Sequence, residues 1–131
     1  MKGYVENIEQ ATKNNTFFRK VLYTGKYSQL VLMSLKPGEE IGAEVHPDID
    51  QFFRFETGHG QVIIDGTIHN VEAEMAVIIP AGADHNVINT GIEDLKLYTI
   101  YSPAEHQDGT IRETKAEAET KPEHFDGKTT E

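Results

Sequence analysis

Short apolar runs separated by turn residues fill the chain from Phe17 to Tyr101. The runs are rich in Val, Ile, Leu, Phe, Tyr and Thr, which are the residue types that favour strands. Turn signals separate them, such as Lys-Pro-Gly at 36–38 and Pro-Ala-Gly at 80–82. Nine runs at this spacing predict an all-β sandwich or barrel. The runs are FFRKVLYT, SQLVLMSL, IGAEVH, QFFRFET, QVIID, TIHNV, MAVIIP, HNVIN and LKLYTIY.

One of the turns is specific enough to predict its geometry. Asp65-Gly66 separates the run ending at Ile64 from the run beginning at Thr67. An Asp-Gly pair between two strand-like runs is the signature of a two-residue β-hairpin, because both central residues must adopt positive φ.

The two ends of the chain differ from this strand-rich region, so we divide it into residues 1–16, 17–102 and 103–131. Residues 1–16 are polar and are expected to form an N-terminal arm or short helix that breaks at Asn14-Asn15. Residues 103–131 form a polar C-terminal tail, in which residues 114–120 are predicted to form a turn or two of helix. The rest of the tail is expected to be frayed or held only by a partner, since it carries little apolar surface. Ile111 and Phe125 are its expected anchors.

Length and composition limit the function classes. The 131 residues suit one domain with a modest core, and the absence of cysteine excludes disulfides and thiolate metal sites. A net charge of −10 argues against nucleic acid, because phosphate contacts require clustered Lys and Arg. No apolar run approaches the ~20 residues of a membrane span. We therefore expect a cytoplasmic protein with no nucleic-acid or membrane partner.

Four polar residues are the candidates for chemistry: Glu44, His46, Gln51 and His85. Successive side chains of a strand point to opposite faces, so Glu44 and His46 share one face of their strand. By the same alternation, the side chains of Gln51 and His85 can point inward from their own strands and converge with those of Glu44 and His46. The predicted wall residues of this small-molecule pocket are Phe53, Phe55 and Val87.

Two imidazoles and one carboxylate are a familiar metal-ligand set. Glu44, His46 and His85 match the two-His, one-carboxylate triad that leaves coordination positions open for substrate or water. Gln51 would be a weak fourth ligand or would hold a bound water. The donor types suit iron, manganese, nickel, zinc or copper without choosing among them. In the alternative interpretation, these histidines are structural, or they bind an organic ligand directly with Glu44.

Two stretches resemble the paired motifs of the cupin superfamily. The first family motif is Gly, five residues, His-x-His, three or four residues, Glu, six residues, Gly. Here it reads GEEIGAEVHPDIDQFFRFETG, in which Gly38, His46 and Gly58 match. The second reads EMAVIIPAGADHNVIN and matches the family at four positions, which are Pro80, Gly82, His85 and Asn89.

The chain departs from the family pattern at two ligand positions. Glu44 stands where the family has its first His, and Gln51 stands where it has Glu. The carboxylate is therefore exchanged between positions rather than lost, which favours continued metal binding. Glu74 also replaces the opening Gly of the second motif.

The resemblance implies a small, single-domain, cupin-2 type protein with a double-stranded β-helix, or jelly-roll barrel. Stand-alone cupins of this kind are often labelled mannose-6-phosphate isomerase-like. The implied function is that of a metal-dependent enzyme of isomerase or oxygenase type acting on a small polar molecule, with Glu44 as the candidate catalytic residue. The alternatives are a non-catalytic sugar- or acid-binding sensor and, less favoured, a structural or storage protein.

Small cupins commonly pair through sheet edges, so a homodimer is expected, with residues 1–20 reaching across to the second subunit. Arg19 could meet an anionic substrate, although nothing in the sequence places it near the candidate site. His106 and His124 are assigned no role.

Overall fold

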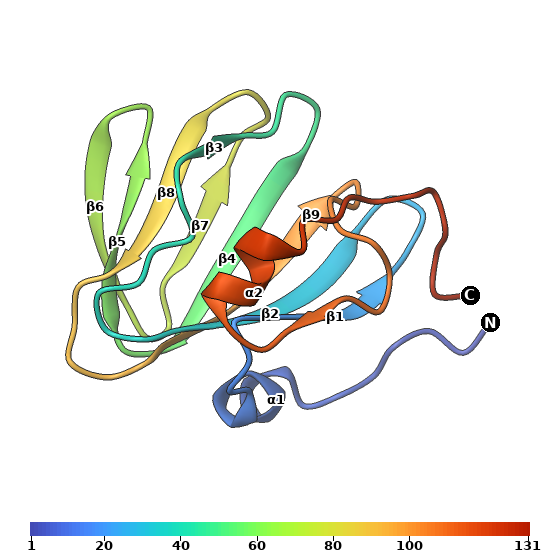
Figure 1. Cartoon of the computed structure of the whole chain (residues 1–131), viewed down its shortest axis with the longest axis horizontal. Coiled ribbons are helices and arrows are strands. Elements are labelled where there is room, and N and C mark those ends of the chain that lie inside the picture. The colour runs from blue at the N-terminus through green and yellow to red at the C-terminus, as the bar shows by residue number, and fades with distance from the viewer.

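Ten strands and two short helices make up the protein in the computed structural model, which describes all 131 residues (Figure 1). The strands form two sheets, one of six strands in the order β10-β1-β2-β9-β4-β7 and one of four in the order β3-β8-β5-β6. Every pairing between neighbouring strands is antiparallel. This confirms the predicted all-β jelly roll. The elements are α1 (Ile8–Asn14), β1 (Arg19–Thr24), β2 (Gln29–Leu35), β3 (Glu44–Val45), β4 (Asp50–Thr57), β5 (His59–Ile64), β6 (Thr67–Glu72), β7 (Ala76–Ile79), β8 (Asp84–Asn89), β9 (Leu95–Ser102), β10 (Ile111–Arg112) and α2 (Lys115–Thr120).

The inner faces of the strands form the core. Along β4, β8 and β9 buried positions alternate with more exposed ones, as expected for strands with one face toward the core. The predicted inward rows of β4 and β8 are therefore confirmed by burial. Their buried members are Gln51, Phe53 and Phe55 on β4, and His85, Val87 and Asn89 on β8.

The hairpin between β5 and β6 has the predicted turn. Asp65 has φ +46° and Gly66 has φ +83°, so both central residues occupy the left-handed region. Val62 lies opposite His69 in the resulting ladder. The two positive φ values are those of the turn whose twist matches that of paired strands.

The N-terminal segment contains the predicted short helix. The side chain of Asn7 accepts a hydrogen bond from the backbone N–H of Gln10 and so caps α1, which ends at Asn14. The helix contacts β9 and β4 and lies against the outer face of the six-stranded sheet of its own chain (Figure 1). Neither helix of the protein has the length and apolarity needed to cross a membrane.

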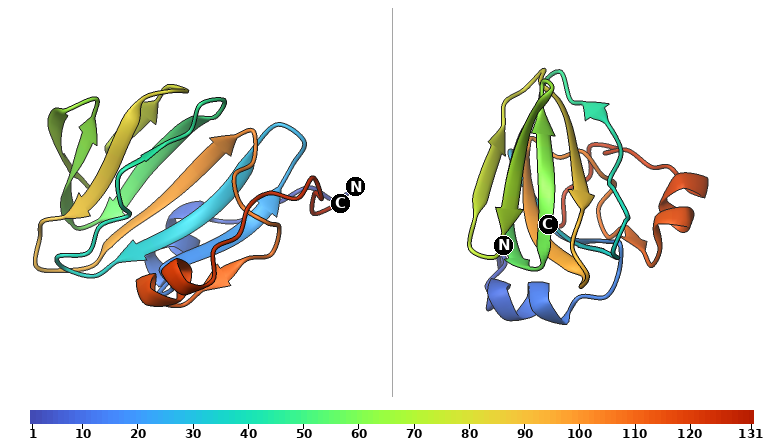
Figure 2. Two further views of the ribbon diagram at one scale, coloured as in Figure 1. Left: turned by 45° about the horizontal axis from the view of Figure 1, so that its top comes forward. Right: turned by 90° about the vertical axis from the view of Figure 1, so that its left-hand side faces the viewer.

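The C-terminal tail includes the expected helix, α2, whose first turn is capped by Thr114. The rest of the tail packs on the barrel, in contrast to the expectation of a frayed segment. The backbone N–H of Thr130 donates to the carbonyl of Thr24 at 2.9 Å, and the two chain ends lie side by side (Figure 2). Ile111, an expected anchor, is 43% exposed, whereas His106 is buried. Polar side chains, rather than apolar ones, therefore hold much of the tail.

Candidate metal centre

Glu44, His46 and His85 converge on one point. Each offers a ligand atom, and the three atoms lie within 4.8 Å of one another. Glu44 on β3 lies directly opposite His85 on β8, which explains how residues far apart in the sequence meet. One carboxylate oxygen of Glu44 lies 3.4 Å from Nε2 of His46 and 3.7 Å from Nε2 of His85.

The two imidazoles are oriented in the same way. Nδ1 of His85 lies 3.1 Å from the carbonyl oxygen of Ala83, and Nδ1 of His46 lies 3.6 Å from a carboxylate oxygen of Glu105. Both Nε2 atoms are buried and have no hydrogen-bond partner. Each ring therefore has an oxygen near its Nδ1, and its Nε2 points toward the common centre. Metal-ligating histidines are held in this way.

The local charges favour the ionised carboxylate. Burial raises the pKa of the Glu44 carboxyl, but the close contact with His46 and its charge, then the charges of His85 and Arg19, outweigh it. The net pKa of Glu44 is below its usual range. The pKa of His46 is raised, chiefly by the Glu44 carboxylate oxygen that lies 3.4 Å from its Nε2, while burial opposes the shift. An anionic carboxylate is thus held beside two imidazoles.

Gln51 is buried on β4, directly opposite Tyr101 of β9. Its Nε2 donates to Oγ1 of Thr99 at 3.0 Å, and its Oε1 is buried without a partner. The amide oxygen is thus free to accept from a ligand or a bound water, and its role at the metal stays a prediction.

The three predicted wall residues are packed in the hydrophobic core. Phe53, Phe55 and Val87 are all fully buried, and the two phenyl rings stack with their centres 6.2 Å apart. None of the three residues lines a pocket of the molecule. A direct contact with substrate therefore stays a prediction.

Tyr101 and His106 extend the site and were not assigned to it from the sequence. The Tyr101 ring meets His46 edge-on, with centres 5.9 Å apart, and its hydroxyl lies 3.2 Å from Nε2 of His106. Nδ1 of His106 in turn lies 3.0 Å from a carboxylate oxygen of Glu123. Burial raises the pKa of Tyr101 far above its ordinary value and lowers the pKa of His106. The phenol is thus protonated at neutral pH.

The sequence offered only a partial signal for these residues. The alternation of β9 required one of Tyr98 and Tyr101 to face inward, and the structure buries Tyr101. Glu105 and His106 follow the last periodic strand, where no pattern specifies a direction.

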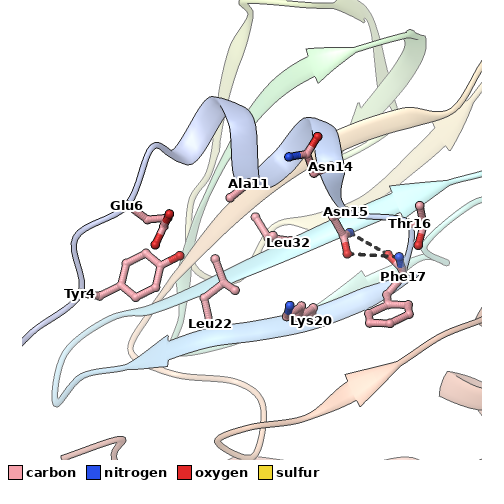
Figure 3. Close-up of a pocket in the computed structure, with 10 residues that line it drawn as sticks. All are labelled: Tyr4, Glu6, Ala11, Asn14, Asn15, Thr16, Phe17, Lys20, Leu22 and Leu32. Carbon is pink, nitrogen blue, oxygen red and sulfur yellow. Dashed lines mark hydrogen bonds between the residues drawn. The ribbon is translucent and has the colours of Figure 1, made fainter.

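The largest pocket of the protein lies away from the triad, between α1 and the outer face of β1 and β2 (Figure 3). It has a volume of about 400 Å³ and is lined by residues such as Tyr4, Leu22 and Leu32. Two hydrogen bonds between Asn15 and Phe17 close one end. None of the candidate site residues lines it. The triad instead reaches solvent through Glu44, whose side chain is 35% exposed.

Comparison with known proteins decides the family. A protein-family model described as a cupin domain matches residues 31–101, a range that contains the whole triad. The chain belongs to the cupin superfamily. The resemblance inferred from the two sequence motifs is thereby confirmed, and the departures at Glu44 and Gln51 are departures within a true cupin.

The cupin is also similar to individual proteins. It is 50% identical to YrkC of Bacillus subtilis over 123 residues, which cover 89% of this chain and 66% of that protein. It is 47% identical to L612 of Acanthamoeba polyphaga mimivirus over 113 residues, which cover 82% of this chain and 70% of the viral protein. The cupin therefore spans only about two thirds of the length of these two relatives. The crystal structure of BH2720 from Bacillus halodurans has a TM-score of 0.90 and 46% identity, covering 92% of this chain and 96% of that one.

Proposed function

We propose that this cupin binds a divalent transition metal through Glu44, His46 and His85. The observation that carries the proposal is the pair of buried Nε2 atoms, which have no hydrogen-bond partner and converge on one carboxylate. Buried polar atoms in proteins nearly always have a partner, so two such atoms at one point indicate a missing ligand. Iron, manganese, nickel, zinc and copper all accept this donor set.

The proposed activity is an isomerase- or oxygenase-type reaction on a small polar molecule. A metal held by this triad would polarise substrate oxygens and lower the pKa of a bound water. Glu44 is the proposed proton-transfer group, and its partly exposed side chain and a lowered pKa that keeps it in the basic form support this role. Gln51 would orient a ligand through its free amide oxygen, beside the apolar wall formed by Phe53, Phe55 and Val87.

A second candidate function is binding without turnover, as in a sensor. Glu44 lies within ion-pair distance of both imidazoles, so the three groups can pair with one another without an ion. A metal-free pocket of this kind would hold a sugar or organic acid directly.

Cobalt(II) absorption separates the two proposals. Cobalt added to the chelator-treated protein should give visible d–d bands at one equivalent, and His85→Ala should abolish them. Exposed His69 provides the control, and His69→Ala should retain the bands. Bands that persist in His85→Ala would refute the ligand assignment. A molecule that stabilises the metal-loaded protein and is recovered unchanged would favour binding alone.

A homodimer in the cytoplasm completes the proposal. The edge strands β7 and β10 leave backbone groups available for pairing, which supports association through an edge. Light scattering at working concentration tests this, and a clean monomer would refute it.

A further inference from the structure

The guanidinium of Arg19 lacks the partners that a buried arginine normally has. Arg19 begins β1 opposite Met33, a fully buried residue of β2, and its own side chain is only 13% exposed. Its Nε is buried and has no hydrogen-bond partner. A guanidinium presents five N–H donors in a planar fork, and burying it without acceptors is unfavourable.

The nearest carboxylate does not satisfy Arg19. A carboxylate oxygen of Glu123 lies 3.7 Å from one terminal nitrogen of the guanidinium, which is too long for a hydrogen bond. The same carboxylate is already engaged by Nδ1 of His106 at 3.0 Å and by the backbone N–H of Gln107 at 3.1 Å. Glu123 thus partly balances the charge of Arg19 but does not accept a hydrogen bond from its guanidinium.

Arg19 belongs to the same interior as the metal triad. Its charge acts on Glu44, where it adds to the effect of the two histidines, and it is the main group opposing the burial-driven rise of the Tyr101 pKa. Tyr101 itself contacts His46 edge-on. Arg19 is therefore linked to the triad by a chain of contacts that runs through Glu123, His106 and Tyr101 and ends at His46.

We propose that Arg19 binds the carboxylate of a small organic acid whose remaining polar groups reach Glu44, His46 and His85. This substrate class rests on the proposed metal site. The planar fork matches a carboxylate bidentately and would satisfy the buried Nε.

Among anions, the charge balance favours a carboxylate over a phosphate. Three carboxylates, those of Glu44, Glu105 and Glu123, would face one guanidinium and a divalent ion. These charges cancel, so a ligand with one negative charge disturbs the balance less than a phosphate with two.

Calorimetric titration of the metal-loaded protein tests the proposal. The probes are two- to four-carbon hydroxy and amino acids, each beside its own neutral amide, together with inorganic phosphate. At least one acid should bind the wild type and lose about tenfold or more in affinity in Arg19→Gln, which is the loss of about one charge-assisted hydrogen bond. Its amide should bind both proteins equally weakly, and Arg19→Lys should be intermediate because it keeps the charge but not the fork.

Lys20→Gln is the matched control, because it removes the same charge from the adjacent, outward-facing position. It should bind the acid like the wild type. Equal affinity in Arg19→Gln and the wild type, no acid preferred over its amide, or phosphate bound more tightly than every acid would overturn the proposal.

Metal content measured on each variant keeps the two proposals apart. Arg19→Gln should retain full metal, so an unchanged acid affinity with metal present refutes the role of Arg19 alone. A wild type that takes up no metal refutes the metal site instead.

Discussion

Nδ1 of His46 lies 3.6 Å from a carboxylate oxygen of Glu105, so the C-terminal tail touches the candidate metal centre. The separation is that of an ion pair rather than a hydrogen bond. Glu105 is fixed by the tail itself, because its backbone N–H donates to Gln29 and its carbonyl accepts from Phe125. The tail therefore holds a carboxylate behind a proposed metal ligand.

Glu105→Ala should weaken metal binding by about tenfold, because the carboxylate behind a ligating histidine fixes its orientation and raises its basicity. Competition with a chromophoric chelator measures this affinity. Glu119→Ala, an exposed residue of α2 whose ion pair with Lys115 lies on the surface, should leave it unchanged. Equal affinities in the two variants would show that Glu105 does not support the site.

Tyr101→Phe should lower the free energy of unfolding by about 1–2 kcal/mol, because it leaves Nε2 of buried His106 without its partner. Urea denaturation provides the measurement. Tyr27 is 74% exposed, so Tyr27→Phe should cause almost no change. If both variants are equally stable, the bond between Tyr101 and His106 contributes nothing to holding the tail.

Gly58→Ala should destabilise the fold by more than about 2 kcal/mol. Gly58 has φ +87°, and a Cβ there would lie 2.6 Å from the carbonyl oxygen of Asp94, so backbone strain and a clash add together. Gly109→Ala separates the two effects, since Gly109 has φ +74° and open space around it. It should cost about 1 kcal/mol from strain alone. Equal losses in the two variants would remove the close approach as the reason for glycine at position 58.

The pair formed by Glu44 and His46 should make the stability of the metal-free protein depend on pH. The folded pKa of His46 is raised, so its contribution is complete below the ordinary value of 6.5 and is lost as pH rises through the raised pKa. The folded pKa of Glu44 is lowered, so its contribution is complete above 4.5 and is lost as pH falls through the lowered pKa. The stabilisation should therefore be greatest between these two values.

Comparison with His46→Gln isolates this effect from other titrating groups. The difference in the free energy of unfolding between wild type and variant, both treated with chelator, should be larger at about pH 5.5 than at about pH 8.5. A difference that grows with pH would contradict the assigned pKa directions.

Much of the barrel was predictable because its strands have one buried face. Alternation along β4 and β8 is strong enough to place Gln51, Phe53, His85 and Val87 inside from the sequence alone. The Asp65-Gly66 turn was equally clear, since its geometry requires residues that accept positive φ.

The tail was not predictable for a physical reason. Its buried members include polar residues that are held by sequence-distant partners. The carbonyl of His106 accepts from the side chain of Gln29, and the carbonyl of Thr110 accepts from the backbone N–H of Val21. No periodicity marks such contacts. Glu105 was consequently not placed at the site, and only the fold brings it within ion-pair distance of His46.

Metal content measured by inductively coupled plasma mass spectrometry tests whether Glu44, His46 and His85 bind a metal ion. The protein should be untagged and purified without chelator, with Glu44→Ala, His85→Ala and the exposed-site control His69→Ala treated identically. We expect nearly one equivalent of a transition metal in the wild type and in His69→Ala, and its loss in the other two variants. An absence of metal in the wild type after reconstitution, or full metal in His85→Ala, would contradict it.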